Sequence, residues 1–185
     1  MCSLYNLAMK ISTKTGDKGE SRLYSGRKLP KASLVFDVLG NLDELNATLG
    51  LCKSSLTDEF REEFLSILEI FQKDIFVIMA IIGNDMKNPK EAYKIDRKNV
   101  LLLEQYIEKF EEEIGEIGEF VMPGDCELSA RLHFTRTVCR RTERSLVKYH
   151  DEILSNLGGV SEFILQYINR LSDLLFLMAY KACKS

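Results

Sequence analysis

The sequence has no tryptophan, only two histidines, and few prolines among its 185 residues. Neither His133 nor His150 has a glutamate three residues before it, so the E-x-x-H pairs of a di-iron helical bundle are missing. The five cysteines are widely spaced, odd in number and without a C-x-x-C pair. This pattern indicates reduced thiols rather than a disulfide framework or a zinc site, and no metal site built by the protein alone is expected.

Long apolar runs are also missing. The longest, at 75–82, falls far short of the roughly 20 residues that a membrane-spanning helix needs. The first residues lack the basic start and apolar stretch of a signal peptide, and Met9 is a plausible second start, so 1–9 is expected to be an extension. A net charge of −3 gives no indication of a nucleic acid or an anionic membrane as partner. We expect a cytoplasmic protein with a single domain over 1–185.

Residues 10–33 differ from the rest of the chain because they are polar, basic and interrupted by glycine. The run T-K-T-G-D-K-G at 13–19 combines glycines, which expose backbone N–H groups, with hydroxyl donors and lysines. This combination suits a polyphosphate. The run is not a P-loop, because G-x-x-x-x-G-K-[ST] occurs nowhere. A solvated basic turn is the other interpretation of this loop.

The remainder, 34–183, shows the apolar spacing of helices. Apolar residues recur every three or four positions within 38–52, 60–82, 100–110, 128–149 and 164–178. Glycines and prolines interrupt the pattern between these segments, and Asp96 is a suitable N-cap for the third one. No convincing strand pair is found. These features predict an all-α fold, a five-helix bundle preceded by an irregular, glycine-containing basic loop.

The fourth helical segment carries charges beside its apolar seam. Arg136, Arg140 and Glu143 share one stripe, whereas Arg141 and Arg144 face elsewhere. The planar fork of arginine suits phosphate oxygens and carboxylates. A solvated face with local Arg–Glu pairs explains the same spacing equally well.

Two other helical segments also contain polar residues. Asn169 and Asp173 lie four positions apart in an otherwise apolar segment, where they are either part of a binding site or a structural hydrogen bond within the bundle. Asp43 and Glu44 lie in the first segment, where a solvated face is the simplest explanation. Spacing alone therefore does not decide whether these four residues belong to a binding site or have a structural role.

Five motifs occur in a fixed order: T-K-T-G-D-K-G at 13–19, G-N-L-D-E-L-N at 40–46, F-V-M-P-G at 120–124, R-T-V-C-R-R-T-E-R at 136–144 and Y-I-N-R-L-S-D-L-L-F at 167–176. Together they resemble the signature blocks of the PduO-type ATP:corrinoid adenosyltransferases, over residues 10 to 180 or so. The resemblance implies a homotrimer of five-helix bundles with each active site between two subunits. It also implies transfer of the 5′-deoxyadenosyl group of ATP, bound with Mg²⁺, to cob(I)alamin or a related corrinoid. The products are adenosylcobalamin and triphosphate, and an electron-donating reductase and an adenosylcobalamin-dependent enzyme are the implied partners.

The resemblance also assigns roles to individual residues. Phe120 corresponds to an aromatic residue that occupies the lower face of the corrin and displaces the axial ligand. Asp43 and Arg136 correspond to an acid and an arginine that pair across the subunit interface, and Lys31 to a phosphate-facing lysine. The expected catalytic residues are Phe120, Asp43, Arg136 and Arg140. The expected nucleotide-binding residues are Thr13, Lys14, Thr15, Gly16, Asp17, Lys18, Gly19, Ser21, Arg22, Lys31, Arg140, Arg141, Glu143, Arg144 and Asn169.

The chain departs from the family pattern in three places. Asp125 stands where a second glycine is usual after Pro123 and Gly124, Thr142 replaces an alanine, and 32–36 lacks the usual D-x-x-V lead-in. Asp125 lies near the expected corrin loop and so bears on corrinoid affinity. Two other functions remain open for the same residues. One is a catalytically silent helical bundle that carries a corrinoid, and the other is an ATP-dependent phosphotransferase that uses the basic loop.

Overall fold

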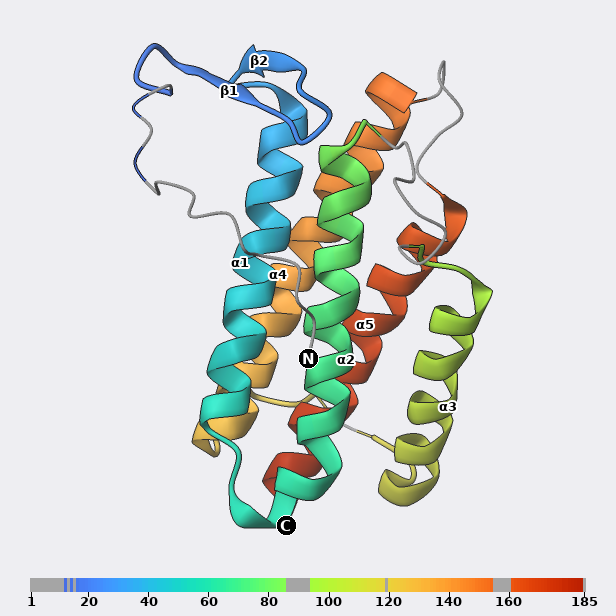
Figure 1. The fold of residues 1–185 in the computed structure, drawn as a ribbon. Helices are drawn as coiled ribbons and strands as arrows, with labels where there is room; N and C mark the ends of the chain where they lie inside the picture. Colours follow the sequence, from blue (N-terminus) through green and yellow to red (C-terminus); the bar gives the residue numbers. More distant parts are fainter. Residues whose placement is uncertain are drawn as a thin grey trace.

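The computed structural model describes residues 12, 14, 16–85, 94–118, 120–154 and 161–184. In these ranges the chain forms a bundle of long helices (Figure 1): α1 (Leu34–Ser54), α2 (Asp58–Gly83), α3 (Arg97–Ile114), α4 (Glu127–Tyr149) and α5 (Glu162–Lys184). A π-helical turn, His150–Leu154, continues α4. The predicted five-helix bundle is confirmed. Within the described ranges, no helix has the length and apolar character needed to cross a membrane.

The apolar residues expected on the inner faces form one core. Leu42, Phe64, Leu103, Leu132 and Leu171, one from each helix, are completely buried. Burial of each such side chain contributes about 1.5–3 kcal/mol. Helix α4 is central, because it packs against both α1 and α5, while α2 packs on α1 and α3 packs on α5. The two faces of α4 are therefore covered by different helices.

Helix α3 begins where the sequence predicted. The carboxylate of Asp96 accepts a hydrogen bond from the backbone N–H of Lys98 at 2.8 Å. In return, Asn99 Oδ1 accepts from the backbone N–H of Asp96 at 3.2 Å. This reciprocal capping satisfies N–H groups that have no partner within the helix.

The basic loop before α1 is not irregular throughout. Glu20–Arg22 (β1) pairs antiparallel with Lys28–Pro30 (β2), with Ser21 opposite Leu29. The expectation of no strand pair is wrong here, because strands of three residues are too short to show an alternating pattern. The hairpin is attached to the core by Leu23, which is 3% exposed. Its turn includes Gly26 at φ +91°, a conformation that favours glycine.

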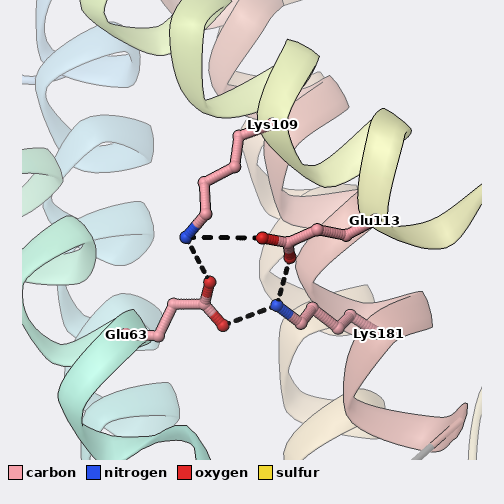
Figure 2. Close-up of polar contacts among 4 residues, drawn as sticks. All are labelled: Glu63, Lys109, Glu113 and Lys181. Carbon is pink, nitrogen blue, oxygen red and sulfur yellow. Dashed lines mark hydrogen bonds and ion pairs between the residues drawn. The ribbon is translucent and has the colours of Figure 1, made fainter.

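The end of the bundle opposite the hairpin is braced by four charged side chains from α2, α3 and α5 (Figure 2). Lys181 Nζ lies 2.7 Å from Glu63 Oε2 and 2.5 Å from Glu113 Oε2. Lys109 Nζ lies 2.6 Å from Glu63 Oε1 and 3.7 Å from Glu113 Oε1. Burial alone would raise the pKa of Glu63, but hydrogen bonds and attraction from both lysines outweigh it and lower the pKa. This four-residue ring fixes the C-terminal end of α3.

Candidate active site

A cavity of roughly 520 Å³ lies between the C-terminal end of α3, the middle of α4 and α5. Arg136 and Arg140 enter it from successive turns of α4, as their shared stripe predicted. The wall of the cavity also includes Asp173 and Phe176 of α5 and Ile117 from the segment after α3. The cavity therefore combines two arginines with the carboxylates of Glu111 and Asp173 and with apolar side chains.

The two arginines of the cavity differ from Arg141, their neighbour on α4. Arg141 forms an ion pair with Glu44 on α1. Neither Arg136 nor Arg140 forms an ion pair with any residue in the described ranges, and Arg136 Nε is buried without a hydrogen-bond partner there. A buried donor without a partner costs about 1–3 kcal/mol. An anionic ligand in the cavity would supply the missing acceptors.

A chain of hydrogen bonds links α3, α4 and α5 beside the cavity. Asn169 Nδ2 donates to Glu143 Oε1 at 3.0 Å, and Arg170 Nη1 donates to Asn169 Oδ1 at 2.8 Å. Arg170 Nε in turn donates to Glu104 Oε1 at 3.1 Å. Partial burial raises the pKa of Asp173, with Arg170 opposing the rise and Glu143 adding to it. The structure thus brings Glu143 and Asn169 together, and the amide of Asn169 is held in one orientation.

His133 is a buried neighbour of the cavity that the sequence did not suggest as a site residue. Its side chain is 2% exposed, and its ring meets Phe176 edge-on at 5.9 Å between centroids. Neither ring nitrogen has a hydrogen-bond partner in the described part of the chain. Burial lowers the pKa of His133, and the charge of Arg136 lowers it further, so the imidazole is neutral at pH 7. Its spacing of three residues from Arg136 is the only signal that could have placed it here.

Lys31 holds the described part of the glycine loop against the hairpin. The backbone N–H of Lys31 donates to Gly19 O at 2.8 Å, and that of Gly19 donates to Gly16 O at 3.2 Å. A Cβ added to Gly16 would lie 2.9 Å from Lys31 Nζ. Glycine at this position therefore lets the ammonium group lie directly over the loop. Thr13 and Thr15 lie outside the described residues.

The other candidates near the glycine loop face solvent or the hairpin. Lys14, Asp17 and Lys18 are exposed. Arg22 Nη1 donates to Gly26 O at 2.8 Å and so closes the hairpin turn, while Ser21 on β1 is partly buried. In one copy of the chain these residues make a basic surface rather than a closed pocket.

The glycine loop and the arginine cavity lie apart in one copy of the chain. The charges of Arg27 and Asp85 act on Tyr149, which places the hairpin beside the C-terminal end of α4. Tyr149 is 13 residues beyond Arg136 on the same helix, which corresponds to about 20 Å. Asp43 is exposed on α1 and forms no pair with Arg136 in one copy. The pairing expected between these two residues across an interface stays a prediction.

Phe120 lies in the segment between α3 and α4 and is fully exposed, at 101%. Met122, two residues on, is 76% exposed. The segment ends at Cys126, the N-cap of α4, whose Sγ accepts from the backbone N–H of Ser129 at 3.4 Å. Cys126 Sγ also lies 3.9 Å from Cys183 Sγ, and both are free thiols. This exposed aromatic residue lies three positions along the chain from Ile117, which lines the cavity.

The buried thiols of the bundle are not activated nucleophiles. Burial raises the pKa of Cys52 to about 11, with the hydrogen bond to Thr135 opposing the rise. Burial also raises the pKa of Cys139, whose Sγ donates to Ile168 O at 3.4 Å. The thiolate is the reactive form of cysteine, so both thiols are inert at neutral pH.

Fold and site together define a helical bundle with a cavity lined by two arginines, two acids and apolar side chains. The family model for cobalamin adenosyltransferases matches residues 11–182, and the chain belongs to this family. It is 36% identical to the corrinoid adenosyltransferase PduO of Salmonella typhimurium over 173 residues, which covers 92% of this chain and 49% of that protein. The human corrinoid adenosyltransferase MMAB is 34% identical over 180 residues, covering 95% of this chain and 70% of the relative. The chain thus spans about half the length of its PduO relative.

Solved structures support the same assignment. A phenylalanine-to-histidine variant of the PduO-type ATP:corrinoid adenosyltransferase from Lactobacillus reuteri, complexed with cobalamin and ATP, superposes with a TM-score of 0.80 at 28% identity, covering 95% of this chain and 91% of that one. An arginine-to-lysine variant complexed with ATP also gives 0.80, at 29% identity over 94% of both chains. The resemblance inferred from the five motifs is confirmed.

Proposed function

We propose that the chain transfers the 5′-deoxyadenosyl group of ATP to the cobalt of cob(I)alamin or a related corrinoid, giving adenosylcobalamin and triphosphate. The observation that carries this proposal is the cavity in which the unpaired Arg136 and Arg140 face the apolar side chains of Ile117 and Phe176. Arginine forks suit the oxygens of a triphosphate, and the apolar wall suits a corrin ring.

In this reaction the protein has to align the reactants and stabilise charge, and it does not have to supply a nucleophile. The cobalt of cob(I)alamin is itself a strong nucleophile. Its electron pair forms the bond to C5′, the C5′–O bond breaks, and triphosphate leaves with the electron pair of that broken bond. The site must hold C5′ opposite cobalt and stabilise the leaving charge. Arg136 and Arg140 fit the second task, and the inert thiols of Cys52 and Cys139 agree with a reaction that needs no nucleophile from the protein.

The remaining candidates fall into two groups around the triphosphate. Glu143 and Asn169, which are hydrogen-bonded to each other about one helical turn from Arg140, suit the nucleoside end of ATP. The glycine loop at 13–19, with Ser21, Arg22 and Lys31, suits the phosphates. Because the loop and the cavity lie apart in one copy, we place the loop of one subunit over the cavity of its neighbour. Arg141 and Arg144 then lie at the edge of the site.

Mg²⁺ enters this proposal with the nucleotide. In the described ranges, no three side chains of the types His, Cys, Asp and Glu gather closely enough to hold a metal ion. Mg²⁺ keeps several waters and is commonly bound by one or two carboxylates together with substrate phosphates. Glu111 and Asp173, which line the cavity, and Glu143, which accepts from Asn169, are carboxylates that could supply such a contact.

Phe120 suits the lower face of the corrin. Its full exposure leaves the ring free to take the place of the axial ligand. Removal of that ligand makes Co(II) easier to reduce, because the four-coordinate form accepts the electron more readily. An electron-donating reductase would supply the electron, and an adenosylcobalamin-dependent enzyme would take the product.

A homotrimer agrees with the outer face of α1 and α4. Leu51 and Phe134 are 48% and 54% exposed and line a groove of roughly 250 Å³ on this face. Large apolar side chains that are exposed together mark association surfaces. The assembly would also give Asp43 and Arg136, unpaired in one copy, partners across the interface. Free thiols 3.9 Å apart at Cys126 and Cys183 suit the reducing cytoplasm.

The experiment that tests the proposal is anaerobic. Chemically reduced cob(I)alamin, MgATP and purified protein are mixed, and the absorbance band of cob(I)alamin is followed while the phosphate products are separated by chromatography. We expect the band to disappear only when protein and ATP are both present, with release of triphosphate. Release of ADP would favour the phosphotransferase. An intact fold that gives no ATP-binding heat in calorimetry would favour the silent corrinoid carrier.

A further inference from the structure

One carboxylate, that of Asp85, fixes the β-hairpin to the end of α2. Ser25 Oγ donates to Asp85 Oδ2, and Arg27 Nη2 pairs with Asp85 Oδ1, so each carboxylate oxygen holds one hairpin side chain. The backbone N–H of Ser25 adds a hydrogen bond to Gly83 O at 3.1 Å. We name Ser25, Arg27 and Asp85 the latch.

The position of Asp85 is energetically unfavourable for α2 itself. Its φ of +54° lies in the left-handed region, which few residues other than glycine adopt. It also lies two residues beyond Gly83, the last residue of α2, where a negative charge opposes the helix dipole and where the last turn has no basic residue. Strained, electrostatically unfavourable positions persist where they serve another purpose. The two contacts to the hairpin are the purpose visible here.

The hairpin transmits this attachment to the glycine loop. Arg27 directly precedes β2 and Lys31 directly follows it, and β2 is paired with β1 along its length. Lys31 binds Gly19 through its backbone and lies over Gly16 through its ammonium group. A hairpin held at its turn therefore keeps Lys31 and residues 16–19 of the loop in a fixed position relative to the bundle.

We propose that Asp85 is a positioning residue for ATP: it acts through Ser25 and Arg27, touches no ligand, and sets the place of the glycine loop. This inference rests on the proposed function for its nucleotide part. It gives the loop an anchor outside the five motifs that carry the family resemblance.

The first test compares two aspartates at the two ends of α2. Asp85→Asn removes the charge but keeps a residue that tolerates the left-handed conformation. Asp58→Asn is the matched control, because Asp58 is fully exposed at the start of α2 and, among the described residues, pairs only with Arg61, at 3.9 Å. We expect Asp85→Asn to raise KM for ATP about fivefold. The KM for cob(I)alamin, kcat and Tm should stay at the values of the unmodified protein and the control. An unchanged KM for ATP, or an equal rise in both KM values, overturns the positioning role.

A double-mutant cycle asks whether Asp85 acts through Arg27. If it does, Arg27→Gln and Asp85→Asn together raise KM for ATP no more than the stronger single change. Two effects that multiply would show that the residues act separately and would overturn the latch.

A readout without ATP separates this inference from the proposed function. Trypsin cuts after the basic residues of the hairpin, and we expect it to cut ligand-free Asp85→Asn several times faster than Asp58→Asn, because the latch no longer closes the hairpin. Faster cutting in a protein whose unmodified form binds no MgATP would keep the latch and overturn the proposed function. Equal cutting rates would overturn the latch itself, whether or not ATP binds.

Discussion

The cavity and the four-residue ring place charged side chains in opposite situations. In the ring each of the four charges has two partners, and the contacts join α2, α3 and α5 (Figure 2). In the cavity Arg136 and Arg140 form no ion pair within the described part of the chain, although the charge of Arg140 acts on Asp173, where it opposes the rise in pKa caused by burial. Charges that are fully paired within the chain hold helices together, whereas charges left without a partner remain available to a ligand. Loss of a cavity arginine should therefore reduce activity, and loss of a ring residue should reduce stability.

The largest effect is expected at Arg140. Arg140→Ala should lower kcat by about 10²–10³, the usual loss when one donor to a developing charge is removed. Tm should stay unchanged, because no ion pair is lost. The measurement is the anaerobic cob(I)alamin assay together with thermal unfolding.

Arg141→Ala sharpens the same comparison. Arg141 was also expected to contact the nucleotide, but its charge is engaged by Glu44 on α1. We expect this variant to keep kcat within a factor of about five, since a half-exposed ion pair contributes less than about 1 kcal/mol. A loss as large as that of Arg140→Ala would contradict the rule that pairing within the chain decides the role.

An effect between those of Arg140→Ala and Arg141→Ala is expected at Phe120. Phe120→Ala should lower the rate from Co(II) with a reductant about tenfold, which corresponds to about 1.4 kcal/mol. The rate from chemically reduced Co(I) should fall less, because the ring acts on cobalt coordination before transfer. Tm should not change, because the side chain makes no protein contact. Equal losses in the two assays would contradict the role at the lower face.

The next prediction concerns Thr142, whose buried hydroxyl group has hydrogen-bond partners within the chain. Its hydroxyl, completely buried, donates to Asn41 O at 3.1 Å and lies 3.0 Å from Val138 O. Thr142→Ala, the residue usual in the family, should lower the free energy of unfolding by about 1 kcal/mol. Urea unfolding measures this change, and kcat should be retained. A variant of normal stability with reduced kcat would place Thr142 in the site instead.

The smallest effect is expected in the ring. Glu63→Gln should lower the free energy of unfolding at pH 7 by less than about 1 kcal/mol, because the side chains are partly exposed and Glu113 still holds both lysines. The folded-state pKa of Glu63 is lowered, so its stabilisation is present above the unfolded pKa of about 4.3 and disappears as the pH falls through the folded value. Tm values of the two proteins should therefore converge below pH 4. A gap that widens in acid would contradict the assigned direction of the shift.

Periodicity was sufficient to predict the helices. Phe64, Leu132 and Leu171 lie at positions where a spacing of three or four residues admits only one buried face, and the structure buries all three. The hairpin was missed because its pairing depends on contacts beyond three-residue strands. Leu23 in the core and Asp85, more than 50 positions away in the sequence, fix it in place.

The site was predictable along a helix but not between helices. The shared stripe of Arg136 and Arg140 follows from their spacing, and the structure places both in one cavity. Arg141 shows the limit, since its partner Glu44 lies on another helix and no local pattern indicates the pair. His133 shows it again, because its place against Phe176 depends on how α4 packs on α5. The roles of Phe120 and Asp43 come from the family resemblance and stay predictions.

The buried nitrogens of His133 and Arg136 have a consequence for the life of the protein in a cell. Three of these atoms have no hydrogen-bond partner in the described part of the chain, and each costs about 1–3 kcal/mol of folding stability. A ligand that satisfied any of them would return that free energy on binding, and binding raises stability by mass action. Unfolded chains are removed by proteases, so a protein of this kind persists longer when its substrates are abundant. Substrate supply would then set how much of the protein is present as well as how fast it works.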